Sequence, residues 1–109
     1  MKIFNINIDN INYTIRLGEN AKENHTIIDY SDPNDWWFHL SDYPSGHCIV
    51  ESFTINNELI KYASELVKQH SKYKNHKNIK VEYNQIKNIK KTKNPGEVII
   101  LKKGGLFVA

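Results

Sequence analysis

Residues 36–40 read Trp-Trp-Phe-His-Leu and residues 47–50 read His-Cys-Ile-Val, and these two runs are the strongest local signals in the chain. Both are short and rich in aromatic or β-branched side chains, which is typical of β-strands. The turn-forming residues from Ser41 to Gly46 predict that the two strands are neighbours. Alternate side chains of a strand point to opposite faces, so Trp37 and His39 share one face and Trp36 and Phe38 share the other.

The residues before these strands predict a hairpin and a short helix. Residues 2–8 are rich in isoleucine, and the turn signal Asp9-Asn10 separates them from a second strand-like run at 13–17. Asn20 is suited to cap a helix, and Glu23 follows it at the spacing of a capping box. We therefore expect a hairpin that ends at Gly18 and a short helix through about Ile28.

The residues after these strands predict the main helix and the end of the sheet. The helix is expected from about Asn56 to Tyr73, because six side chains recur there at helical spacing on one face: Leu59, Tyr62, Ala63, Leu66, Val67 and His70. Strands are expected at 79–83, 98–101 and 106–108, with a bend and a short turn at 84–93, a tight turn at 94–96 and a hairpin turn at 102–105. Together these elements predict one α+β domain over residues 1–109, with a small antiparallel or mixed sheet of five to seven short strands packed on one main helix.

The composition excludes several classes of protein. The only cysteine is Cys48, so no internal disulfide can form and no zinc site can rest on cysteines alone. No apolar run approaches the roughly 20 residues of a membrane span, and the alternating start of the chain is unlike a signal peptide. We expect a cytoplasmic protein without a membrane partner.

Charge is divided unevenly along the chain. Residues 1–67 carry four basic against ten acidic side chains, a net −6, whereas residues 68–109 carry eleven lysines against Glu82 and Glu97, a net +9. A lysine-rich surface with few acids attracts a polyanion and releases its counterions on binding. The alternative is a solvated lysine-rich face with no ligand.

Seven lysines are the candidate phosphate contacts of the basic half: Lys72, Lys74, Lys77, Lys80, Lys90, Lys91 and Lys93. Lysine contacts to phosphate position a nucleic acid without reading its bases. Arg16 is the only arginine, so bidentate reading of guanine by arginine is nearly unavailable. We expect binding through shape and backbone, strongly weakened by salt, with Tyr73 and Tyr83 as further stacking candidates.

Trp37, His39 and His47 are the other candidate nucleic-acid contacts. An aromatic ring in a strand is usually part of the core, but an exposed ring could stack on a base. His39 and His47 could meet across the turn and contact phosphate beside Gly46, or they could be structural and hold the turn. His39, His47 and Cys48 are acceptable metal ligands, but no ligand spacing supports a metal site, and no metal or cofactor is expected.

Catalysis has little support in the sequence. Ser45 lies near His47, and Asp35 or Asp42 could orient that base, but no nucleophile elbow or phosphate-binding loop is present. We expect no enzymatic activity.

The order of several short motifs resembles one known family. Asp35-Trp36-Trp37-Phe38-His39-Leu40 followed by Tyr43-Pro44-Ser45-Gly46-His47-Cys48 resembles the D-x-W-F-H-V and P-G-S-H-V signature of the NFACT-R domain. The segments 18–24, 79–83, 89–91 and 94–98 resemble further parts of that family, so the resemblance runs from about Gly18 to Val108. Two departures stand out, because Ser45-Gly46 reverses the family order and Cys48 replaces an aliphatic residue.

The resemblance implies an RNA-binding domain. In multidomain relatives this domain accompanies other modules on stalled large ribosomal subunits, where it helps to engage tRNA and ribosomal RNA in ribosome-associated quality control. We therefore expect RNA (tRNA or ribosomal RNA) as the partner, on the large ribosomal subunit, with DNA as the alternative polymer. Two other hypotheses stay open: a protein-interaction adaptor that docks a basic partner through the acidic N-terminal half, and a small hydrolase that uses Ser45 or His47.

Overall fold

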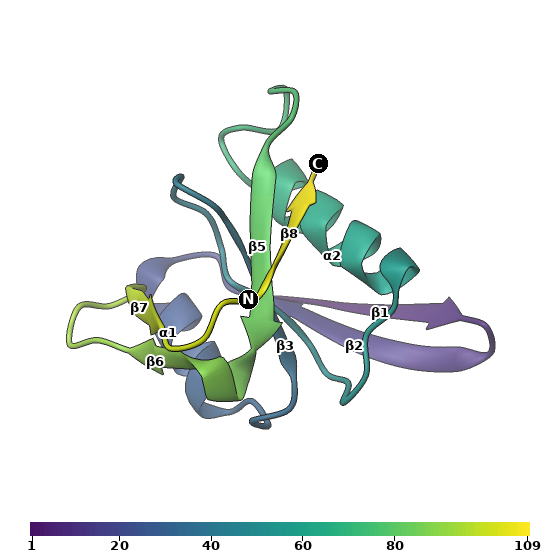
Figure 1. Cartoon of the computed structure of the whole chain (residues 1–109), viewed down its shortest axis with the longest axis horizontal. Helices are drawn as coiled ribbons and strands as arrows, with labels where there is room; N and C mark the ends of the chain where they lie inside the picture. The colour runs from purple at the N-terminus through teal and green to yellow at the C-terminus, as the bar shows by residue number, and fades with distance from the viewer.

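The computed structural model describes residues 1–109 and contains eight strands and two helices (Figure 1). In chain order the elements are β1 (Lys2–Ile8), β2 (Ile11–Leu17), α1 (Ala21–Asp29), β3 (Trp36–Leu40), β4 (Cys48–Val50), α2 (Asn57–Gln69), β5 (Lys80–Gln85), β6 (Ile89–Lys91), β7 (Val98–Ile100) and β8 (Gly105–Val108). A short 3₁₀ turn, Ile86–Asn88, lies between β5 and β6. The predicted α+β class is confirmed.

Six strands form one antiparallel sheet in the order β1-β2-β4-β3-β5-β8. The remaining two strands, β6 and β7, form a separate ribbon beside it. β3 and β5 pair over five residues, from Trp36 opposite Gln85 to Leu40 opposite Val81. The central position of β3 in this order agrees with its composition, because central strands are buried and favour aromatic and β-branched side chains.

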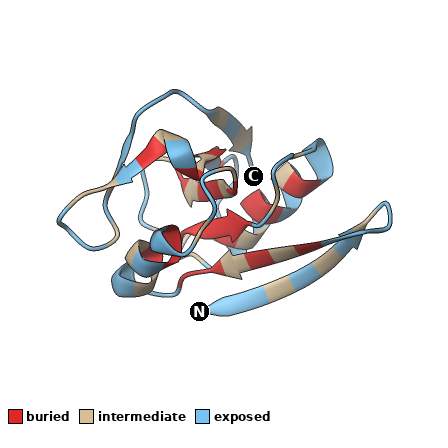
Figure 2. Ribbon diagram, turned by 90° about the horizontal axis from the view of Figure 1, so that it is seen from below, coloured by how far each residue is buried: buried red, intermediate tan, exposed pale blue.

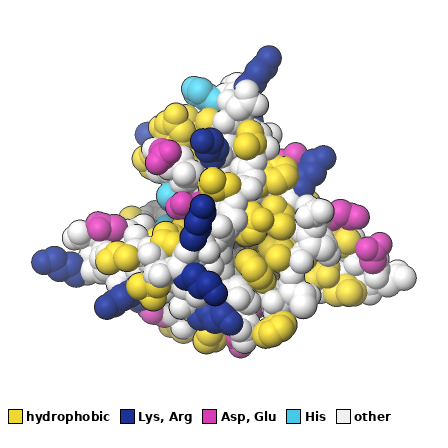
Figure 3. All heavy atoms as spheres, viewed as in Figure 1, with side chains coloured by type: hydrophobic (Ala, Val, Ile, Leu, Met, Phe, Trp, Pro, Cys, Tyr) yellow, Lys and Arg dark blue, Asp and Glu magenta, His cyan; other side chains and the backbone are white.

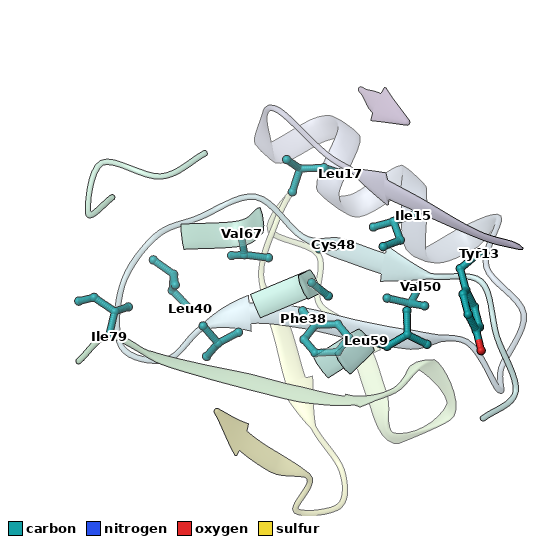
Figure 4. Packing of buried hydrophobic residues seen from close by; sticks show 12 residues of the cluster. Tyr13, Ile15, Leu17, Phe38, Leu40, Cys48, Val50, Leu59, Val67 and Ile79 are labelled. Carbon is teal, nitrogen blue, oxygen red and sulfur yellow. The ribbon is translucent and has the colours of Figure 1, made fainter. Parts of the chain in front are cut away.

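Helix α2 packs on one face of the sheet and forms the larger core. Phe38, Leu40, Cys48 and Val50 point from β3 and β4 toward Leu59 and Val67 of the helix, as Figure 4 shows. Helix α2 begins where the Asn56 side chain accepts a hydrogen bond from the Leu59 amide, 2.9 Å away. It ends at Gln69, earlier than predicted, because the Ser71 amide and hydroxyl both donate to the Lys68 carbonyl, at 3.1 and 2.7 Å, instead of continuing the helical hydrogen-bond pattern.

The opposite face of the sheet is covered as well. A second cluster joins Ile27 and Ile28 of α1, Trp37 and Ile49 of the sheet, and Ile86 and Ile89 next to the ribbon. Figure 2 shows buried positions through the middle of the molecule, with exposed tips on the β1–β2 hairpin and on the β6–β7 ribbon. Both faces of β3 therefore lie in packed core.

Two sequence predictions about the last third of the chain are wrong. The stretch 84–93 was expected to be a bend with a turn, but it also contains strand β6. Residues 102–105 were expected to close a hairpin, but the strands on either side pair elsewhere: β7 pairs with β6, and β8 pairs with β5.

Candidate nucleic-acid interface

The lysines of the basic half lie mostly on the surface. Nine of the eleven lysines in residues 68–109 are exposed, and none of these nine forms an ion pair with a carboxylate. The two half-buried lysines have partners: Lys68 donates to the Ala109 backbone carbonyl and Lys91 pairs with Asp29 of α1. A cation without a carboxylate partner keeps its attraction for an external anion, so the nine exposed lysines are the stronger candidates.

The predicted lysine contacts form two groups at opposite ends of β5. Lys72, Lys74 and Lys77 lie in the loop between α2 and β5, and Lys80 is the first residue of β5. The loop is organised by Tyr73, whose ring lies 4.5 Å from that of Tyr43 and 5.3 Å from that of His76, centroid to centroid.

The second group lies on the β6–β7 ribbon, beyond the other end of β5. Lys90 and Lys93 are exposed, whereas Lys91 is held by Asp29. A six-residue strand spans about 20 Å, so an anion that contacts both groups has to be extended, as a nucleic-acid backbone is.

The structure adds three lysines that the sequence analysis did not select, namely Lys87, Lys102 and Lys103, all of them exposed. Lys87 follows β5, and the other two lie in the segment between β7 and β8. Figure 3 shows dark blue side chains along the face over β5 and further ones at the tip of the ribbon. We call the surface formed by these nine exposed lysines the basic face. The Lys102-Lys103-Gly104-Gly105 sequence was a usable signal, because glycines let lysine-bearing backbone lie close to a strand.

Trp37 and His47 do not belong to the basic face, and their selection as direct nucleic-acid contacts is corrected. Trp37 is 0% exposed and His47 is 1% exposed, so neither ring has a free face for a base or a phosphate. The His39 ring stacks on that of Trp37 at 5.7 Å and meets that of His47 edge-on at 5.0 Å. Of the three, only His39 is partly exposed, and it alone stays a candidate contact.

The loop that holds His47 is fixed by Asn24 of α1, which the sequence analysis did not single out as a structural residue. The Asn24 Oδ1 accepts from the His47 amide at 2.9 Å, and the His47 carbonyl accepts from the Gly18 amide at 2.9 Å. Gly46 is required here because a Cβ would lie 2.3 Å from the Gly18 carbonyl oxygen. These contacts of His47 agree with the structural interpretation, in which His47 holds the turn.

Burial, and to a smaller extent the nearby His39, lower the pKa of His47 to about 3. The unfolded chain takes up a proton on this side chain below about pH 6.5, whereas the folded protein does not until about pH 3. Stability contributed by neutral His47 is therefore present above pH 6.5 and is lost as the pH falls.

We expect the free energy of unfolding to fall by about 2 kcal/mol between pH 7 and pH 5 because of His47 alone. Denaturant titrations at several pH values measure it, with a His47→Gln variant as the reference. If the free energy of unfolding changed with pH equally in the wild type and in the variant over this range, the result would contradict a buried neutral imidazole at His47.

Few side chains of the structure are placed for catalysis or for metal binding. The Ser45 hydroxyl accepts from the Leu40 amide and donates to the Gly46 carbonyl, so it is engaged with backbone groups. Cys48 is buried, and burial raises the pKa of its thiol. No group of three or more His, Cys, Asp or Glu side chains is placed to hold a metal ion. No helix is long and apolar enough to cross a membrane.

An α+β domain whose sheet is covered on both faces, with exposed lysines along and beyond β5, has the surface expected of a polyanion-binding module. The family model described as the NFACT protein RNA binding domain matches residues 1–108, and the chain belongs to that family. This membership supports a nucleic-acid-binding role with RNA as the partner. The resemblance found in the sequence motifs is confirmed.

A solved structure shares the fold. The C-terminal part of the fibronectin/fibrinogen-binding protein from Streptococcus suis superimposes with a TM-score of 0.84 at 21% sequence identity. The similarity covers 95% of this chain and 43% of that chain, so the present sequence spans less than half of the similar structure. No curated protein sequence matches the chain.

Proposed function

We propose that this domain binds structured RNA, tRNA or ribosomal RNA, by gripping its phosphates with the basic face, and that it does so without catalysis. The observation that carries the proposal is the set of nine exposed lysines without carboxylate partners. They lie in the loop before β5, at the start of β5, in the turn and ribbon after it, and in the segment between β7 and β8. Lysine-to-phosphate contacts release counterions and so supply affinity without sequence readout.

The proposed setting is a cytoplasmic one, on the large ribosomal subunit during ribosome-associated quality control. Support comes from family membership and from the surface, which suits a large folded RNA with phosphates presented over an extended area. A non-catalytic role is supported by the Ser45 hydroxyl bonded to backbone and by the low pKa of His47, since a neutral imidazole that resists protonation is a weak general base.

The proposal predicts tight, salt-dependent binding to tRNA. We expect the logarithm of the affinity to fall linearly with the logarithm of salt concentration, with a slope of about −4 if four to six phosphates are contacted. Fluorescence anisotropy with labelled tRNA at a series of salt concentrations measures the slope, and a duplex DNA of similar length gives the RNA-to-DNA ratio.

Two results would contradict the proposal. Absence of tRNA binding at low salt removes the nucleic-acid function and leaves the adaptor hypothesis. Binding that is unchanged by salt shows that phosphate contacts do not supply the affinity.

A further inference from the structure

One acidic side chain lies within the basic face without a partner. In residues 68–109 the only acids are Glu82 and Glu97, and Glu97 accepts a hydrogen bond from the Asn94 side chain at 2.9 Å. No hydrogen bond in the structure reaches the carboxylate of Glu82, and no lysine pairs with it. A carboxylate repels phosphate. Glu82 would therefore contact a part of the ligand other than its phosphates.

The nearest basic group does not neutralise this carboxylate. The Glu82 Oε1 lies 3.8 Å from the His39 Nδ1. Burial lowers the pKa of His39, so its imidazole is neutral at pH 7. Burial also raises the pKa of Glu82, as expected for a half-buried carboxylate that lacks N–H donors. N–H donors of a bound ligand would supply the hydrogen bonds that the Glu82 carboxylate lacks within the protein.

Glu82 lines a pocket of about 210 Å³ beside β5, together with the apolar side chains of Ile100 and Leu106. Ile100 of β7 and Leu106 of β8 are 40% and 57% exposed. Both therefore offer apolar surface to a ligand in the pocket. Lys103 lies on the rim without an ion pair to Glu82. The space suits a single heterocyclic base and is too small for a base pair.

The segment with Gly104 and Gly105 shapes this pocket. A Cβ on Gly104 would lie 2.2 Å from the Tyr83 carbonyl oxygen, and one on Gly105 would lie 2.2 Å from the Tyr83 ring. Only glycine lets the chain run this close to β5, and this brings Lys103 and Leu106 to the pocket that holds Glu82.

We propose that this pocket binds a guanine base of single-stranded RNA, with the guanine N1–H and N2–H donating to the Glu82 carboxylate and the O6/N7 edge facing Lys103. Guanine is the base whose pairing edge offers two adjacent N–H donors, and lysine is a common partner of O6 and N7. Unpaired bases with their edges free are the usual targets of sequence-specific RNA binding. This inference rests on the proposed RNA-binding function and adds a base preference to it.

The test uses nine-nucleotide oligouridines whose central base is guanine, inosine, adenine, cytosine or uracil, titrated by anisotropy at one salt concentration. Inosine lacks only the N2 amino group, so it isolates one of the two proposed donors. We expect guanine to bind about tenfold more tightly than the other bases, with inosine in between. In Glu82→Gln the guanine preference disappears, while binding to plain oligouridine stays the same or tightens.

Glu97→Gln is the matched control, because it removes the same charge from the same half of the chain and should keep the preference. Equal binding of all five oligonucleotides by the wild type, with tRNA still bound, would overturn the guanine pocket and leave the proposed function intact. No binding to any oligonucleotide or to tRNA at low salt would overturn both. The inosine comparison needs no variant, so the test stands even if Glu82→Gln folds poorly.

Discussion

Replacing Lys80, Lys90 and Lys102 together with glutamate lowers the affinity for tRNA by about 100-fold or more at physiological salt, because three phosphate contacts become repulsive. All three side chains are exposed and have no hydrogen bond or ion pair within the protein, so their reversal should leave folding intact. Anisotropy titration measures the affinity, and thermal unfolding checks the fold.

The matched control reverses Lys2, Lys22 and Lys61, three exposed lysines of the N-terminal half. The net charge changes by the same amount, so a loss caused only by overall charge would be equal in both variants. We expect the control to lose much less affinity than the basic-face variant. Equal losses would show that the lysines act through net charge and that no particular face is used.

Replacing Trp37 with alanine lowers the free energy of unfolding by about 3–5 kcal/mol, the usual cost of removing a large buried ring. The side chain is 0% exposed, packs against α1 and the ribbon, and stacks on His39. A domain of this size has about 5–15 kcal/mol of stability in total, so the melting temperature should fall by more than 10 °C.

Trp36→Ala is the control for this prediction. Trp36 is the neighbouring residue on the same strand, but it is only half-buried and packs at the edge of the other cluster. Denaturant unfolding of both variants should show the smaller loss at Trp36. A larger loss at Trp36 would contradict the packed second face of the sheet.

Local pattern was sufficient to predict much of the fold. The β1–β2 hairpin, strand β3 and the helix around Leu59 and Val67 were all predicted, because each carries its own turn, cap or periodicity. The capping of α1 was also predicted, since the Asn20 side chain does accept a hydrogen bond from the Glu23 amide at 2.8 Å. These signals act within a few residues and need no knowledge of distant partners.

The ribbon could not be predicted in the same way. Strand β6 has three residues, of which only Ile89 is buried, and it lies within a lysine-rich stretch. The glycine turn at 102–105 indicated a local hairpin, but the strands around it find more distant partners: Val98 packs against the second cluster, and Phe107 lies opposite Val81. Partner choice here depends on tertiary packing, which a local turn signal does not contain.

The candidate site was predicted in part for the same reason. Charge imbalance along the chain identified the lysines, and the structure shows where they are exposed. The role of Trp37 depended on whether the second face of the sheet is covered, and that cover comes from α1 and the ribbon. One sequence signal was available, because the runs at 36–38 and 48–50 are apolar without alternation, as in strands buried on both faces.

The most direct test of the RNA-binding face is an NMR titration of the isotope-labelled domain with unlabelled tRNA, which maps contacts residue by residue. Binding through the basic face predicts that amide signals of the 70–78 loop, β5, β6 and residues 101–106 shift or broaden at low salt and recover when salt is raised. Changes confined to the β1–β2 hairpin and α1, with the lysine-bearing segments unaffected, would contradict it.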